Sequence, residues 1–138
     1  QEDFNGKLKA LIALKASPEK INNLRKDIIK RQRDDGGWAQ LSEMESDAYA
    51  TGQTLYTLLT ETPKTDRDLT FNESIIKARS YLLKNQKDDG SWLVKTRSKP
   101  IQKFFDNGDP HGKNQFISIS ATSWATAALA KFHSIKGL

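Results

Sequence analysis

Three cations alternate along one short stretch of the chain. Lys95, Arg97 and Lys99 occupy every second position, and every second side chain of an extended strand points the same way. The stretch from Leu93 to Pro100 is therefore expected to be strand-like, with three positive groups that bind a carboxylated or phosphorylated ligand. The alternative is an edge strand that is protected by its charges and binds nothing.

A turn-rich segment, Asp106 to Gly112, follows these cations. It contains His111, and Asp109 lies two positions before it. A histidine near an acid is a candidate general acid or base, and Asp109 is a candidate ligand-binding group. The alternative is turn chemistry, in which the imidazole bonds a loop carbonyl or Asp109. Two distant histidines and no cysteine do not favour a transition-metal site, so neither a metal nor another cofactor is expected.

Helices are expected to position these candidates, because apolar residues recur at helical spacing through most of the chain. Asp47 begins one such helix, either as its N-cap or as a catalytic acid; Ser42–Glu45 is an alternative capping box. Another capping box, Thr70–Glu73, is expected to start the fourth helix, which should bury Ile75, Ile76, Leu82 and Leu83. Tyr49, Trp124 and the loop are expected to line a cavity.

One heptapeptide occurs twice, as Gln32–Trp38 and again as Gln86–Trp92. Five of its seven positions are identical, and the two copies are 54 residues apart. Such a recurrence indicates a repeat architecture. The glycine accepts the positive φ that ends a helix, the glutamine can bond backbone groups there, and the tryptophan packs on the next helix. Gln32, Trp38, Gln86 and Trp92 are therefore assigned structural roles.

Lys77–Leu82, followed by Gln86, Gly90 and Trp92, resembles the complete Gln-Trp repeat of the squalene-hopene cyclase and prenyltransferase superfamily. The first copy departs from the family pattern at Asn23, Leu24 and Asp27. The resemblance implies an α/α toroid, in which each repeat has an outer helix, a Gln-Trp turn and an inner helix.

The resemblance does not extend to the chemistry of that superfamily. Class II cyclases carry an Asp-x-Asp-Asp motif, whereas Asp47–Thr51 keeps only the first acid. Protein prenyltransferases need an Asp, Cys and His zinc site, and this chain has no cysteine. We therefore expect a non-catalytic module that binds a small molecule, such as an isoprenoid, or a partner protein.

A second resemblance supports a different function. Gln32–Trp38, and Asp47 with Ala50–Thr51, are similar to stretches of α/α-toroid pectate lyases. Those enzymes use acids with calcium, and an arginine base, on uronic acid polymers. The alternative is thus a polysaccharide-active enzyme on an anionic glycan, with Asp47, Arg97 and His111 as catalytic candidates.

The length suits one domain, 1–138. The helical periods predict an all-α fold of about five helices in antiparallel pairs, and the resemblance implies that they form part of an α/α toroid. Its repeat units are expected at about 18–60 and 70–136, with an insertion at about 93–117. A six-repeat toroid needs more than twice this length, so we expect a homo-oligomer or a part of a larger chain.

The charge pattern and the start of the sequence bear on partners and location. The net charge of +5 is dispersed, which does not favour nucleic acid. No apolar run approaches the roughly 20 residues of a membrane span. The Gln1 start resembles a mature terminus in the periplasm or outside the cell, although an arbitrary boundary would look the same.

Overall fold

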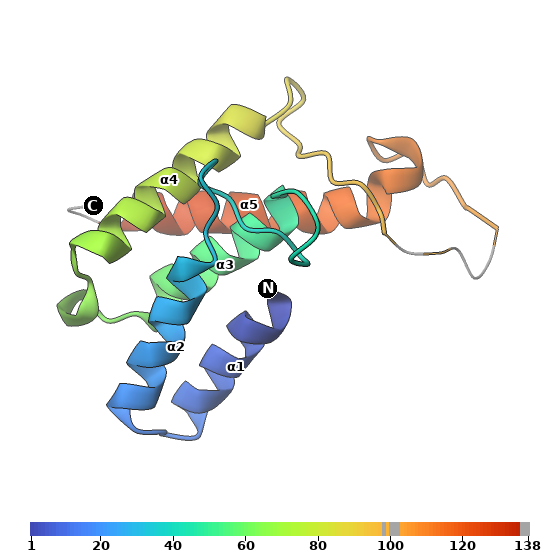
Figure 1. Ribbon diagram of the computed structural model, residues 1–138. Helices are drawn as coiled ribbons and strands as arrows, with labels where there is room; N and C mark the ends of the chain where they lie inside the picture. Colours follow the sequence, from blue (N-terminus) through green and yellow to red (C-terminus); the bar gives the residue numbers. More distant parts are fainter. Residues whose placement is uncertain (98, 100–102, 136–138) are drawn as a thin grey trace.

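A computed structural model of the chain describes residues 1–97, 99 and 103–135. These residues form five α-helices and no β-strand (Figure 1). The α-helices are α1 (Glu2–Ala13), α2 (Pro18–Lys30), α3 (Ala48–Glu61), α4 (Leu69–Asn85) and α5 (Gln115–Ser134). Two single turns of 3-10 helix are η1 (Lys64–Asp66) and η2 (Gly112–Asn114). The all-α fold class and the partial α/α toroid are confirmed.

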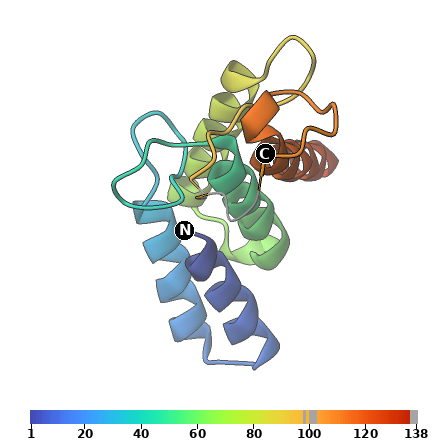
Figure 2. The ribbon, with the colours of Figure 1, turned by 90° about the vertical axis from the view of Figure 1, so that its right-hand side faces the viewer.

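The central helix is α3, which packs against α1, α4 and most extensively α5. Figures 1 and 2 show α1 and α2 side by side as a hairpin at one end of the molecule. After α4 the chain turns away from that hairpin, and Arg97 then returns to a recess at the amino end of α1. All five helices contribute to one apolar core, with fully buried side chains such as Leu8, Ile28, Leu55, Ile75 and Ala125.

Small residues let α3 and α5 approach closely. A Cβ atom placed on Gly52 would lie 2.6 Å from the backbone nitrogen of Ala125, closer than atoms pack without a shift. Only a glycine fits that contact.

Polar side chains cap the amino ends of α2, α3 and α4. Ser17 caps α2, whose first residue is Pro18. The Asp47 carboxylate caps α3 and accepts from the Ala50 N–H at 2.8 Å, so capping is one of its roles. The capping box expected at Thr70–Glu73 is wrong, because α4 begins earlier and Asp68 caps it.

The stretch after Trp92 is not a strand in its described part, residues 93–97 and 99. Side chains of the α5 region bind its backbone in place of a neighbouring strand. The N–H of Val94 donates to Ser118 Oγ at 3.0 Å, and that of Thr96 to Asn114 Oδ1 at 2.9 Å. The expected strand is therefore replaced by a loop that follows α5; Ser98 and Pro100 lie outside the described residues.

Two apolar side chains of α4 are more exposed than expected. Ile76 is 49% exposed and Leu83 is 43% exposed, whereas Ile75 and Leu82 are fully buried. A helix buries one stripe only, and the residue after each buried one turns outward. The expectation that all four are buried is wrong for Ile76 and Leu83.

Candidate functional site

The first copy of the heptapeptide, residues 32–38, forms a tight corner between α2 and α3, called corner 1. The Trp38 indole is buried, and its Nε1 donates to the Ile28 carbonyl at 2.8 Å. Gln32 Nε2 donates to the Gly36 carbonyl at 2.8 Å, across a backbone with φ +87° at that glycine. The Trp38 N–H donates to Thr51 Oγ1 of α3 at 2.9 Å. These bonds fix where α3 begins.

The second copy, residues 86–92, repeats each of these bonds between α4 and α5 and is called corner 2. Trp92 Nε1 donates to the Leu82 carbonyl at 2.8 Å. Gln86 Nε2 donates to the Gly90 carbonyl at 2.9 Å, with φ +82° at the glycine. The Trp92 N–H donates to Thr122 Oγ1 of α5 at 3.1 Å. The same sequence thus produces the same corner twice.

The corners differ in what covers them. At corner 1, Gln32 Nε2 also donates to the Ser74 carbonyl of α4 at 2.9 Å. A Cβ on Gly36 would lie 2.6 Å from the Lys77 carbonyl oxygen of the same helix. At corner 2 both the glutamine and the glycine are exposed. Corner 1 is therefore covered by a neighbouring helix, whereas the glutamine and the glycine of corner 2 lie at the surface.

The serine that donates to the second aspartate comes from within corner 2 but from outside corner 1. At corner 2, Ser91 Oγ donates to Asp89 Oδ1 at 2.6 Å. Corner 1 has Gly37 instead, and the Ser46 hydroxyl donates to Asp35 Oδ1 at 3.0 Å. A Cβ on Gly37 would lie 2.7 Å from the Ser46 Cβ, so a serine does not fit there without a shift.

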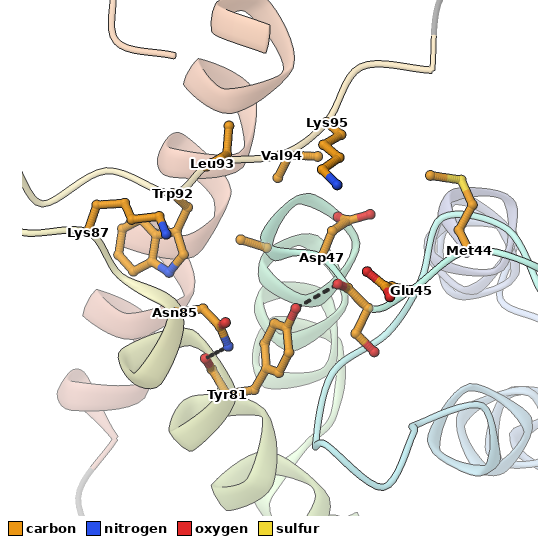
Figure 3. A pocket seen from close by; sticks show the side chains of 12 residues that line it. Met44, Glu45, Asp47, Tyr81, Asn85, Lys87, Trp92, Leu93, Val94 and Lys95 are labelled. Atoms are coloured by element: carbon orange, nitrogen blue, oxygen red, sulfur yellow. Dashed lines mark hydrogen bonds between the residues drawn. The ribbon is translucent and has the colours of Figure 1, made fainter.

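A cleft of about 300 Å³ lies at the amino end of α3, beside corner 2 (Figure 3). Asp47 comes from the start of α3, Lys95 from the loop above it, and Tyr81 from α4. The Tyr81 hydroxyl donates to the Ser46 carbonyl at 2.7 Å, the contact dashed in Figure 3. Burial raises the pKa of Tyr81, so this phenol stays a neutral donor. The cleft is lined by apolar groups as well, namely Met44, Ala48, Trp92, Leu93 and Val94.

A smaller recess of about 100 Å³ lies against the amino ends of α1 and α3. Gln40, Tyr49 and Arg97 line it, together with Glu2. The Tyr49 hydroxyl donates to Glu2 Oε1 at 3.2 Å. Burial, and then the charge and hydrogen bond of Glu2, raise the pKa of Tyr49, so its hydroxyl remains protonated.

Gln40 joins two of the candidate residues. Its Nε2 donates to Asp47 Oδ2 at 2.9 Å, and its Oε1 accepts from Arg97 Nε at 3.1 Å. The structure therefore brings Asp47 and Arg97 together through a single side chain. Gln40 was not among the sequence candidates, because nothing in its type or spacing distinguishes it from other polar residues near a turn.

The environment of Asp47 favours its neutral form. Burial raises the pKa of its carboxyl, and the hydrogen bonds from Ala50 and Gln40 and the charge of Arg97 oppose that rise. Among the described residues Arg97 has no acid within ion-pair distance. Its guanidinium is exposed, and Nε alone has a hydrogen bond to another described residue.

The other cations and the aromatic candidate lie elsewhere. Lys95 lines the large cleft, Arg97 lines the small recess, and Lys99 is exposed and lines neither. Trp124 also lines neither. Its ring lies 5.7 Å from that of Tyr56 and 5.6 Å from Lys9 Nζ.

His111 lies at corner 2, in a left-handed conformation with φ 79°. Its Nε2 is 2.7 Å from Ser91 Oγ. Because the Ser91 hydroxyl donates its proton to Asp89, the imidazole is the donor in this contact. Hydrogen bonds from Ser91 lower the pKa of the Asp89 carboxyl. This arrangement anchors the loop and does not activate the serine. Asp109, two residues before His111, is partly exposed.

No group of three or more His, Cys, Asp or Glu side chains is placed to hold a metal ion within the part of the chain that the structure describes. None of the helices described there has the length and apolarity to cross a membrane.

No protein-family model matches the chain, and no curated protein matches it. A solved structure does. It is described as a possible member of the GH105 family from Salmonella enterica subsp. enterica serovar Paratyphi A, and it aligns with a TM-score of 0.53 and 17% identity. The match covers 94% of this chain and 36% of that chain. This likeness shows a shared fold, and the chain spans about a third of its neighbour's length.

Proposed function

We propose that this chain is part of a polysaccharide-active protein, and that it binds an acidic sugar of an anionic glycan beside Asp47. The neighbour in fold is described as a possible member of GH105, a glycoside hydrolase family. That likeness favours a carbohydrate ligand over an isoprenoid. The proposal rests on the single observation that Gln40 links Asp47 to Arg97 at the amino end of α3.

Arg97 is the group suited to the sugar carboxylate. Its Nε–H is held by Gln40, which orients the guanidinium. The two terminal nitrogens then form a planar fork that matches a carboxylate. Glu2 lines the same recess, but its carboxylate accepts from Tyr49 and makes no ion pair with Arg97.

Asp47 is the candidate acid or base of the site. Its raised pKa suits proton transfer closer to neutral pH than an ordinary aspartate allows. In the proposed reaction Arg97 holds the uronate carboxylate and ionised Asp47 takes the proton from C5 of that sugar. The C4–O glycosidic bond then breaks as a C4–C5 double bond forms, and the released oxygen takes a proton from water. His111 is assigned a loop-anchoring role, because its hydrogen bond is to Ser91 at corner 2.

A second candidate function is a non-catalytic module of the terpene-cyclase-like kind that binds an isoprenoid. The apolar lining of the large cleft, from Met44, Trp92, Leu93 and Val94, favours it. The capping of α3 gives Asp47 a sufficient structural role in that case. The two functions predict different ligands for the two recesses.

A calorimetric titration separates these functions. We expect trigalacturonate to bind, and a neutral galactose trimer and farnesol to bind far more weakly. Arg97→Gln should weaken trigalacturonate binding about tenfold or more, since a hydrogen bond to a charged group contributes about 1.5–3 kcal/mol. Lys113→Gln removes the same charge from an exposed position and should leave binding unchanged. Binding of farnesol alone, or equal binding to both variants, would refute the proposal.

Catalysis is tested with Asp47→Asn, which keeps a capping oxygen and removes the acid. If the chain cleaves polygalacturonate, this variant should lose turnover and keep trigalacturonate binding. Reducing ends and ultraviolet absorbance of the products report the cleavage. Binding without turnover in the wild type would contradict the catalytic part and favour a binding module.

A further inference from the structure

One face of α5 is exposed and carries no charge through four turns. Phe116 is 55% exposed and Ile119 is 41% exposed, and three small or polar residues continue the same face. We call this face the α5 seam, and it comprises Phe116, Ile119, Ser123, Thr126 and Ala130. These positions follow a strict three-then-four spacing, the pattern by which one helix packs on another. An exposed helix face normally carries charged residues.

The equivalent face of α3 shows how such a seam packs against a neighbouring helix. Thr51 and Thr122 make the same bond to the two tryptophan backbones, so α3 and α5 align with an offset of 71 residues. The seam positions 119, 123, 126 and 130 then correspond to Ala48, Gly52, Leu55 and Leu59. All four of those residues are buried, and the glycine meets the backbone of α5.

Corner 2 is likewise uncovered where corner 1 is covered by a neighbouring helix. At corner 1 the glutamine and the glycine are covered by α4, through Ser74 and Lys77. At corner 2 a Cβ on Gly90 would meet nothing nearer than Gln86 Nε2 at 3.9 Å. Leu83, 43% exposed, precedes this corner on α4. The uncovered corner and the uncharged seam therefore belong to one open side.

We propose that this side of α4 and α5 is a docking face for a further pair of helices of the same kind as α4 and α5. The first helix of the pair places a backbone carbonyl on Gln86 Nε2 and passes close to Gly90, as α4 does at corner 1. The second helix lays a small-residue stripe, like Ala121, Ala125 and Ala128, along the seam. The interface so formed continues the one that α3 and α5 already share.

Ser123 sets a limit on that packing. Ser123 occupies the position on α5 that corresponds to Gly52 on α3. A Cβ atom on Gly52 would lie 2.6 Å from the backbone nitrogen of Ala125, so α5 approaches α3 closely only because Gly52 has no side chain. A serine side chain prevents an equally close approach. The second helix of the pair therefore lies farther from α5 than α5 lies from α3.

An extended protein provides the test, with a second copy of residues 62–138 fused after residue 138 so that the α3–α4 connection is reused. We expect its urea midpoint to rise above that of the original chain, because stacked repeats stabilise one another through their interfaces. Ile119→Lys in the first copy should remove most of that rise. In the original chain the same change should shift the midpoint little, since Ile119 is 41% exposed there.

Ala10→Lys is the matched control, because Ala10 is an exposed residue of α1 and is not part of the α5 seam. It should leave the rise intact. An extended protein with no higher midpoint would overturn the proposal, and so would a rise that survives Ile119→Lys. Light scattering that finds the original chain dimeric, and monomeric after Ile119→Lys, would also overturn it, because the occupant would then be a second copy.

Discussion

The duplicated glutamines allow one substitution to be compared in two environments. Gln32 Nε2 donates to the Gly36 carbonyl and to the Ser74 carbonyl of α4, whereas Gln86 Nε2 donates to the Gly90 carbonyl only and is exposed. A net hydrogen bond contributes about 0.5–1.5 kcal/mol. Gln32→Ala should therefore lower the free energy of unfolding by about 1–3 kcal/mol, and Gln86→Ala by at most about 1 kcal/mol.

Urea unfolding followed by tryptophan fluorescence measures this difference, because Trp38 and Trp92 are both buried. In a thermal scan, the excess loss at Gln32 should lower the melting temperature by a further few degrees, roughly 4 °C per kcal/mol. Equal losses at the two positions would refute the reasoning, since they would mean that the bond to Ser74 adds nothing. A larger loss at Gln86 would refute it more strongly.

Two further predictions concern the glycines of the two corners and Asp47. Gly90→Ala should lower the free energy of unfolding by about 1–2 kcal/mol, because the glycine has a left-handed backbone. Gly36→Ala should lower it by about 1–3 kcal/mol more, because the added Cβ would overlap Lys77. Equal urea midpoints for the two variants would contradict this. Because burial raises the pKa of Asp47, its contribution to stability should fall as pH rises from its ordinary value of 3.8 through the raised pKa, and Asp47→Asn should remove that fall. Unfolding curves with the same pH dependence for both proteins would disprove it.

Local rules predicted much of the scaffold. The helical periods and the repeated corner both depend on residues close together in sequence. The capping box at Thr70–Glu73 was wrong because Asp68, two residues earlier, offers a carboxylate to the Phe71 N–H. This cap also depends on residues close together in sequence, and an aspartate directly before the apolar run could have predicted it.

The path of the loop after Trp92 required tertiary information. Alternating Lys95, Arg97 and Lys99 predicted a strand with one charged face, but no partner strand exists among the described residues. The Ser118 and Asn114 side chains bind the loop backbone instead. The sequence does not specify that those side chains face the loop.

The candidate site was predicted in part. The chain of bonds from Asp47 to Arg97 was not predictable, because it depends on Gln40, which has no distinguishing spacing. His111 was grouped with Asp47 and Arg97 by residue type, and its hydrogen bond is to Ser91 at corner 2. Whether these residues act on a glycan remains a prediction.

The most direct measurement of the central claim is a nuclear magnetic resonance titration of the ¹⁵N-labelled chain with trigalacturonate. The account predicts that the Arg97 Nε–H and Gln40 side-chain amide signals shift together and reach saturation, while the Trp92 indole signal stays in place. Shifts confined to Trp92 and Leu93, or no saturable shift at Arg97, would contradict it.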